Sequence, residues 1–219
     1  MRRKAPVRIM KKAPYQSAQD CIGELTKGCS IIGFTKGQFS LLDLIHAVSS
    51  QIGPASLTVS TWSTGIRDTQ NLGVLIDQGA FTSVSLCLDR SFSGRQPGYV
   101  EEVIRVWGKE NIRMTRNHSK FFLLRNENWN ICVRSSMNLN RNPRFEQFDL
   151  DDSLEMCEFF QVIIDELFDK MPPGMEKKVN TCDKVFPELI GGGISDQYSE
   201  KDISKLWSDL EPWGKTWNE

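Results

Sequence analysis

The sequence predicts an α/β domain, a mostly parallel sheet flanked by helices, followed by an acidic C-terminal tail. Between residues 29 and 109, short runs rich in β-branched residues alternate with segments whose apolar residues recur at helical spacing. Two further strand-like runs, 118–124 and 129–134, are joined by a polar turn, which indicates a hairpin. A long amphipathic helix over about 153–170 then ends before a Pro-Pro-Gly sequence.

The individual elements follow from local patterns. Strands are predicted at 29–35, 55–62 and 81–88, and helices at 67–79 and 97–109. Ser40 is a suitable N-cap for another helix that runs through Val48. Pro97 suits a first helical turn. The apolar stripe of the helix at 153–170 is predicted to be Met156, Phe159, Phe160, Ile163, Ile164, Leu167 and Phe168.

Composition divides the chain into three parts. Residues 1–14 carry six basic residues and no acid, which predicts a flexible basic arm. Residues 15–171 form the predicted domain, and 172–219 form a tail that contains Trp207, Trp213 and Trp217. The arm is either a phosphate-binding segment or a disordered terminus. The tail either folds back onto the domain or docks on a protein partner.

Charge is distributed unevenly along the chain. Residues 1–144 hold 20 Lys and Arg against 10 Asp and Glu, whereas residues 145–219 hold 7 against 18. A basic body with an acidic end suits a protein that meets a polyanion on one face, although two solvated surfaces of opposite sign explain the same numbers.

Several classes of protein are disfavoured by composition. No apolar run approaches the roughly 20 residues that span a bilayer, and no apolar signal core follows Lys12. The six cysteines include no C-x-x-C pair and the chain has two histidines, which argues against a structural zinc site. We therefore expect a cytoplasmic protein with reduced core cysteines, no membrane association and no metal.

The informative stretch is residues 116–149. His118 and Lys120 are two residues apart on a predicted strand, so their side chains leave from the same face. The next predicted strand opens into Ser136 and Asn138, and pairing of the two strands brings all four side chains together. A neutral imidazole can attack phosphorus and form a phosphohistidine, while Lys and Asn neutralise the non-bridging oxygens.

A carboxylate behind the imidazole would fix its tautomer and raise its basicity. Glu146 is the preferred candidate, and Asp149, Asp151 and Asp152 are the competing choices. Asp151 and Asp152 are also explained as acids at the N-terminus of the following helix. This chemistry needs neither metal nor cofactor.

These residues resemble the half-motif of the phospholipase D superfamily, which reads H-x-K-x4-D, then G-S-x-N, then a downstream Glu. The resemblance is tightest over about residues 116–149, and the order of elements from 29 to 170 is compatible with the family's fold. The family includes phospholipases, lipid synthases, endonucleases and DNA-repair phosphodiesterases. The resemblance implies a phospholipase-D-like mixed sheet with one half-motif per chain, His118 as nucleophile, and Lys120 and Asn138 as phosphate ligands.

Two positions depart from the family pattern. Arg125 stands where the family has Asp, and Ser135 where it has Gly. Because that Asp is largely structural and some nuclease members lack it, the departure points away from phospholipases more than from nucleases. Basic residues are the predicted nucleic-acid contacts, although those of the 140–144 loop could be solvated charges. The predicted contacts are Arg125, Arg134, Arg141, Arg144, Arg2, Arg3 and Lys4.

A complete site in this family combines two half-motifs, in which one histidine attacks and the other protonates the leaving group. The second histidine here, His46, lies in an apolar helical segment without an H-x-K or S-x-N companion, so it is predicted to pack rather than react. A second copy of His118 must then complete the site, which predicts a two-fold homodimer.

The expected function is a metal-independent phosphodiesterase, a nuclease acting on nucleic acid, with DNA favoured over RNA. A non-catalytic nucleic-acid-binding or assembly protein of a phage or mobile element, with the same fold, is the alternative. A phospholipid-cleaving enzyme is a third reading, but the sequence contains no amphipathic membrane-surface helix and no lipidation signal.

Overall fold

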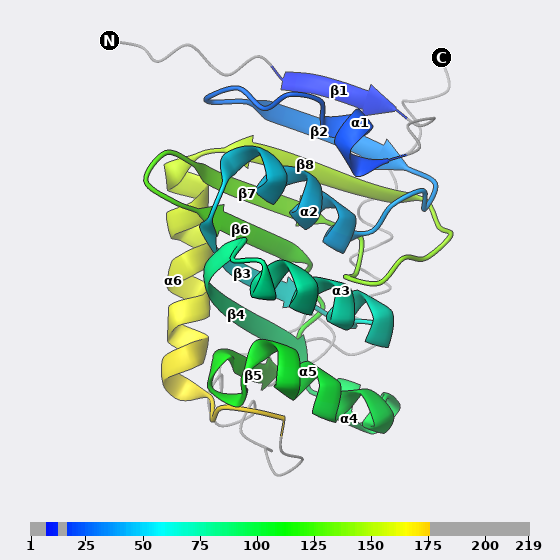
Figure 1. Ribbon diagram of the computed structural model, residues 1–219, viewed down its shortest axis with the longest axis vertical. Helices are drawn as coiled ribbons and strands as arrows, with labels where there is room; N and C mark the ends of the chain where they lie inside the picture. Colours follow the sequence, from blue (N-terminus) through cyan, green and yellow to red (C-terminus); the bar gives the residue numbers. More distant parts are fainter. Residues whose placement is uncertain (1–7, 13–16, 176–219) are drawn as a thin grey trace, which may run out of the picture. The chain divides into compact units, whose positions relative to one another are not determined.

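The computed structural model describes residues 8–12 and 17–175, and its centre is a single sheet (Figure 1). Its strands lie in the order β1-β2-β8-β7-β6-β3-β4-β5. Their bounds are β1 Arg8–Lys12, β2 Ser30–Thr35, β3 Ala55–Thr61, β4 Phe81–Asp89, β5 Ile112–Thr115, β6 Phe121–Arg125, β7 Asn130–Ser135 and β8 Glu146–Asp152.

The sheet is mixed rather than mostly parallel. The pairs β1–β2, β3–β4 and β4–β5 are parallel, whereas β2–β8, β8–β7, β7–β6 and β6–β3 are antiparallel. The mixed sheet that the family resemblance implied is confirmed, whereas the mostly parallel sheet expected from the alternation of strands and helices is wrong, because that expectation overlooked β8. This strand inserts between β2 and β7 and runs antiparallel to both.

The helices begin and end where local chemistry allows. The longer ones are α2 Leu41–Ile52, α3 Ile66–Asp77, α5 Val100–Trp107 and α6 Leu154–Lys170, and the short ones are α1 Ala18–Ile22 and α4 Phe92–Arg95. Ser40 caps α2 through a capping box with Asp43, as its position predicted. Ser153 caps α6 through Met156 N at 3.3 Å. Pro97 lies in a short 3₁₀ turn, Pro97–Tyr99, before α5, and a second such turn is Lys109–Asn111.

Helices cover both faces of the sheet: α2, α3 and α5 lie over one face, and α6 crosses the other (Figure 1). Successive side chains of β3 point to opposite faces of the sheet, which shows what each face contacts. Leu57 and Val59 belong to the main apolar cluster, whereas the Oγ1 of Thr58 lies 3.3 Å from Gln161 of α6. Phe121 of β6 contacts Phe160 of α6, with ring centroids 4.6 Å apart.

Beneath α6 the core contains two thiols. Cys132 of β7 and Cys157 of α6 are both buried. Burial raises the pKa of each thiol to about 12, so both are neutral at physiological pH. They behave as small apolar side chains, which agrees with the expectation of core cysteines. Cys182 lies outside the described residues.

The apolar stripe of α6 is only partly buried. Ile164 and Leu167 are buried, but Phe159 is 62% exposed and Ile163 is 42% exposed. Val162 is 66% exposed, so one side of the helix presents apolar side chains to solvent. The predicted apolar stripe included residues that do not reach the sheet, because only a narrow face of α6 contacts it.

Three strands were not predicted. Residues 8–12 of the expected flexible arm form β1, which pairs in parallel with β2. Residues expected to form a polar loop and the acidic start of a helix form β8, which ends with Asp151 and Asp152. β5 has four residues, and Pro173 and Gly174 of the expected tail bond to it through Arg113 and Ile112. The rest of the tail lies outside the described residues.

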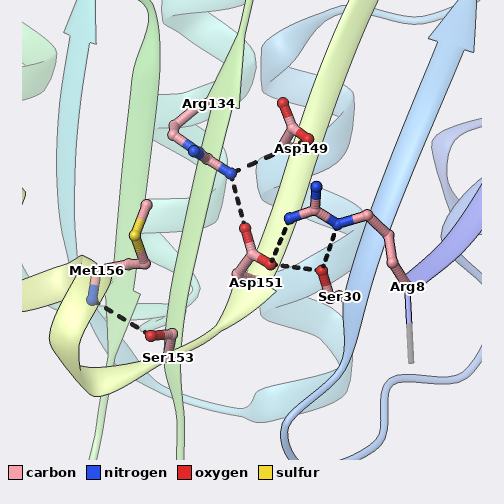
Figure 2. Close-up of polar contacts among 7 residues, drawn as sticks. All are labelled: Arg8, Ser30, Arg134, Asp149, Asp151, Ser153 and Met156. Atoms are coloured by element: carbon pink, nitrogen blue, oxygen red, sulfur yellow. Dashed lines mark hydrogen bonds and ion pairs between the residues drawn. The ribbon is translucent and has the colours of Figure 1, made fainter. Parts of the chain in front are cut away.

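A polar ladder crosses the sheet on the face that α6 occupies (Figure 2). Arg8 of β1 donates to Ser30 of β2 at 3.1 Å, and Ser30 donates to Asp151 of β8 at 2.6 Å. Arg134 of β7 donates to Asp151 at 2.9 Å and lies 4.0 Å from Asp149. The ladder ties four adjacent strands together by side chains as well as by backbone bonds.

Candidate functional site

The predicted site residues lie at one edge of the sheet. This is the edge where β3, β4 and β7 end and where β6 and β8 begin. Two loops meet there, which we call the histidine loop (116–120, before β6) and the asparagine loop (136–145, between β7 and β8). Ends of neighbouring strands are a common place for ligand sites in α/β folds.

The histidine loop is held by a buried asparagine. The Nδ2 of Asn117 donates to Ser60 Oγ at 2.9 Å and to the carbonyls of Thr61 and Cys87, both at 3.2 Å. Its backbone N donates to Asp89 at 2.9 Å. Its Oδ1 accepts from Ser119 N at 2.9 Å and from Ser119 Oγ at 2.6 Å. These bonds fix the backbone on either side of His118.

With the backbone fixed, His118 projects outward. Its side chain is exposed, and the Nζ of Lys120 lies 3.2 Å from Nδ1 and 3.3 Å from Nε2. Lys120 also donates to the carbonyl of His118 at 2.8 Å. The indole of Trp62 meets the imidazole of His118 edge-on, with 6.0 Å between the ring centroids. The guanidinium carbon of Arg95 lies 3.8 Å from the centroid of the Trp62 ring.

The ammonium of Lys120 is half-buried. Burial lowers its pKa below the usual value for lysine, and the negative charge of Glu146 opposes this effect. A lysine that contacts the imidazole is suited to neutralise a phosphate that binds beside it.

Ser135, the last residue of β7, bonds to the histidine loop, and the asparagine loop that follows it bonds to β8 and β3. Ser135 N donates to the carbonyl of Lys120 at 2.8 Å. Ser136 Oγ donates to Glu146 and accepts from Gln147 N at 3.0 Å. Thr61 Oγ1 lies 3.5 Å from Asn138 Oδ1. The structure thus brings all five predicted catalytic residues to one edge of the sheet.

Ser135, which replaces the family glycine, is accommodated without strain. All described non-glycine residues have negative φ, so this position does not require glycine. The hydroxyl of Ser135 donates to the carbonyl of Gln147 at 2.7 Å and accepts from Met137 N at 2.9 Å. It therefore closes the turn that leads to Asn138.

Among the four candidate carboxylates, Glu146 is the one at this edge. Asp149 and Asp151 flank Arg134, and Asp152 accepts from Asn130 N at 3.1 Å. Within the described part of the chain, Glu146 bonds to Ser136 and makes no hydrogen bond with His118. The idea that Glu146 orients the imidazole stays a prediction.

The predicted nucleic-acid contacts are scattered. Arg125 lies at the far end of β6, roughly 16 Å along the chain from Lys120, where its Nε is 3.4 Å from Asn130 Oδ1. Arg134 belongs to the ladder of Figure 2. Arg141 and Arg144 are exposed on the asparagine loop, and Arg141 donates to the carbonyl of Gly37 at 2.9 Å. Arg2, Arg3 and Lys4 lie outside the described residues.

His46 is exposed rather than packed. It lies on the solvent side of α2 and lines a pocket with Asp43 and Arg141, so the expectation that it is a packing residue is wrong. Helical periodicity placed it next to apolar neighbours, but those neighbours point to the opposite side of the helix.

Among the residues described, no cluster of three or more potential metal ligands occurs. No helix in the described part of the chain is long and apolar enough to cross a membrane.

Sequence reasoning missed the residues that support the site. Asn117 and Asp89 fix the histidine loop, while Trp62 contacts the imidazole and Arg95 stacks on Trp62. Asn117 immediately precedes His118, and Trp62 is the last residue of the strand predicted at 55–62. Those positions were the available signal, because a residue at a strand end is placed at the same edge as the site.

The fold is that of the phospholipase D family: a mixed sheet flanked by helices on both faces. The chain is similar to the phospholipase D family member Nuc from Salmonella typhimurium, with a TM-score of 0.50 and 10% identity over 67% of this chain and 98% of that one. It is also similar to NucT from Helicobacter pylori, with a TM-score of 0.49 and 13% identity over 66% and 99% of the two chains.

A weaker likeness joins it to TrmBL2, an archaeal chromatin protein with a novel mode of DNA binding, at a TM-score of 0.43 and 8% identity over 64% of this chain and 53% of that one. No family model matches the sequence, and no curated protein matches it. The likeness is therefore one of fold.

Proposed function

We propose that this protein is a metal-independent phosphodiesterase that cleaves nucleic acid through a phosphohistidine at His118. The observation that carries the proposal is the convergence of His118, Lys120, Ser136, Asn138 and Glu146 at one edge of a phospholipase-D-like sheet. Imidazole, ammonium, hydroxyl, carboxamide and carboxylate together supply a nucleophile and the ligands of a phosphate.

The reaction proceeds in two displacements. An imidazole nitrogen of His118 attacks phosphorus, and the bond from phosphorus to the leaving oxygen breaks. Lys120 and Asn138 hold the non-bridging oxygens as their charge increases. Water then attacks the phosphohistidine and releases the histidine. Because Lys120 already contacts the imidazole, a phosphate that binds to Lys120 lies next to the nucleophile.

The leaving oxygen needs a proton, and a second copy of the chain is the proposed source. The exposed position of His118 is compatible with a site shared between two subunits. In a two-fold dimer, the partner's His118 protonates the leaving group and then activates the water. His46 lies on α2 without a lysine or asparagine companion from the motif, so it is not assigned this role.

The proposal is tested by incubating the wild-type protein and His118→Ala with plasmid and single-stranded DNA in EDTA. We expect cleavage by the wild type alone. Cleavage by both proteins, or cleavage that EDTA abolishes, would contradict the proposal. DNA binding without cleavage by either protein would favour the alternative, a non-catalytic nucleic-acid-binding protein, for which Arg125 at the family's Asp position is the supporting observation.

The shared site is tested by mixing. When equal amounts of wild type and His118→Ala are unfolded together and refolded, about a quarter of random dimers contain two intact histidines. A site that needs both histidines should then give about a quarter of the undiluted activity. An activity of one half would show that each subunit works alone.

A further inference from the structure

A pocket of about 260 Å³ opens on the α6 face of the sheet, next to the candidate site. It shares Lys120 with that site, so one part of its wall lies where the reacting phosphate is proposed to bind. The pocket extends from there between α6 and strands β6, β7 and β8. Its lining includes Lys120, Phe121, Arg134, Gln147, Asp149 and Phe160.

One wall of the pocket is aromatic. Phe160 of α6 is partly exposed and lines the pocket, and the ring of Phe121 supports it at 4.6 Å between centroids. Phe159 contacts Phe160 edge-on from outside the pocket, at 5.2 Å and 88°. Phe160 is thus braced on two sides, and a braced aromatic ring is a platform for a planar ligand.

The charges of the pocket disfavour a second phosphate. Arg134 already donates to Asp151 at 2.9 Å and lies 4.0 Å from Asp149, which itself lines the pocket (Figure 2). The inner part of the pocket therefore has no surplus positive charge, and a phosphate placed there would face a carboxylate. Asp149 and Gln147 instead offer acceptors and an amide, which are the groups that bind base edges.

We propose that this pocket binds the base of a nucleotide next to the reacting phosphate, with the base stacked on Phe160. This inference rests on the proposed function, because it places the phosphate at Lys120. A base that enters the pocket has left any duplex, so the pocket selects single-stranded nucleic acid over double-stranded. Phe160 then determines specificity rather than taking part in the chemistry.

The test compares two short labelled oligomers of equal length: an oligothymidylate and its abasic deoxyribose-phosphate analogue. Their phosphates are the same, so the electrostatic part of binding cancels in the ratio of dissociation constants. Fluorescence anisotropy should show the wild type binding the base-bearing oligomer roughly tenfold more tightly, as expected for one stacked base. Phe160→Ala should remove this preference, whereas Phe159→Ala should keep most of it.

Phe160→Trp guards against a general packing defect, because a larger ring at the same position should restore the preference that Phe160→Ala removes. Equal wild-type binding of both oligomers would overturn the base pocket, as would a preference that survives in a folded Phe160→Ala.

A base-free substrate, methyl p-nitrophenyl phosphate, tests the chemistry separately. If the wild type fails to hydrolyse it while the binding preference holds, the proposed function fails and the pocket stands.

Discussion

The two loops of the candidate site are held in different ways. The histidine loop is anchored by buried Asn117, which bonds to the ends of β3 and β4 and to Ser119. The asparagine loop begins with Ser136, which bonds to Glu146, and its Met137 and Leu139 are buried, while its arginines Arg141 and Arg144 are exposed. The histidine loop therefore depends on the hydrogen bonds of one buried amide, whereas the asparagine loop depends on apolar packing and on the bond from Leu41 N to the carbonyl of Asn138.

The largest expected effect comes from the charge in the histidine loop. Lys120→Met removes the ammonium next to the imidazole, and we expect kcat on single-stranded DNA to fall about 10²–10³-fold. Lys36→Met is the matched control, since Lys36 is exposed after β2. Unchanged kcat in Lys120→Met would show that Lys120 does not stabilise the transition state.

Removing the anchor should loosen the same loop without touching the reacting groups. Asn117→Ala removes the amide that donates to Ser60 Oγ and to the carbonyls of Thr61 and Cys87, so we expect the free energy of unfolding to fall by about 2–3 kcal/mol. Urea denaturation measures it, with the exposed Asn128→Ala as control. Similar unfolding curves for the two variants would show that the histidine loop does not depend on this anchor.

The pH dependence of activity tests the influence of the Glu146 charge on Lys120. Catalysis needs charged Lys120, whose pKa burial lowers, so activity should decline on the alkaline side below the usual range for lysine. Glu146→Gln removes the charge that raises this pKa, so the alkaline limb should move to lower pH. Lys120→Arg should move it to higher pH. A limb that is the same in all three proteins would assign it to another group.

The smallest expected effects concern the arginines. Arg144→Ala in the exposed asparagine loop should weaken DNA binding a few-fold and reduce the slope of log K against log salt by about one. Arg125→Ala, at the far end of β6, should leave the slope unchanged. Equal effects of both substitutions would mean that the binding surface extends well beyond the candidate site.

Local patterns predicted much of the fold. Ser40 caps its helix as expected, and the strands at 55–61 and 81–89 agree with their β-branched runs. The missed strand β8 places polar residues, several of them acidic, between its apolar residues. Its Asp151 pairs with Arg134 because β8 lies between β2 and β7 in the sheet. Pairing between distant segments is a tertiary property that local periodicity does not contain.

The candidate site was predictable to the same degree. The spacing of His118, Lys120, Ser136 and Asn138 along a hairpin brought the four residues to one edge, although His118 and Lys120 precede β6 rather than lie within it. Support from Asn117 and Trp62 depends on β3 and β4 ending beside the hairpin. That neighbour relation follows from the sheet order, which the sequence pattern left open.

The most direct test of the central claim is to trap the intermediate. Wild-type protein is mixed with a single-stranded oligonucleotide in EDTA, quenched at alkaline pH, where phosphohistidine survives, and digested for mass spectrometry. We predict a nucleotide adduct on the peptide that contains His118, and no adduct in His118→Ala. Cleavage of the oligonucleotide with no adduct on His118, or an adduct on another residue, would contradict the account.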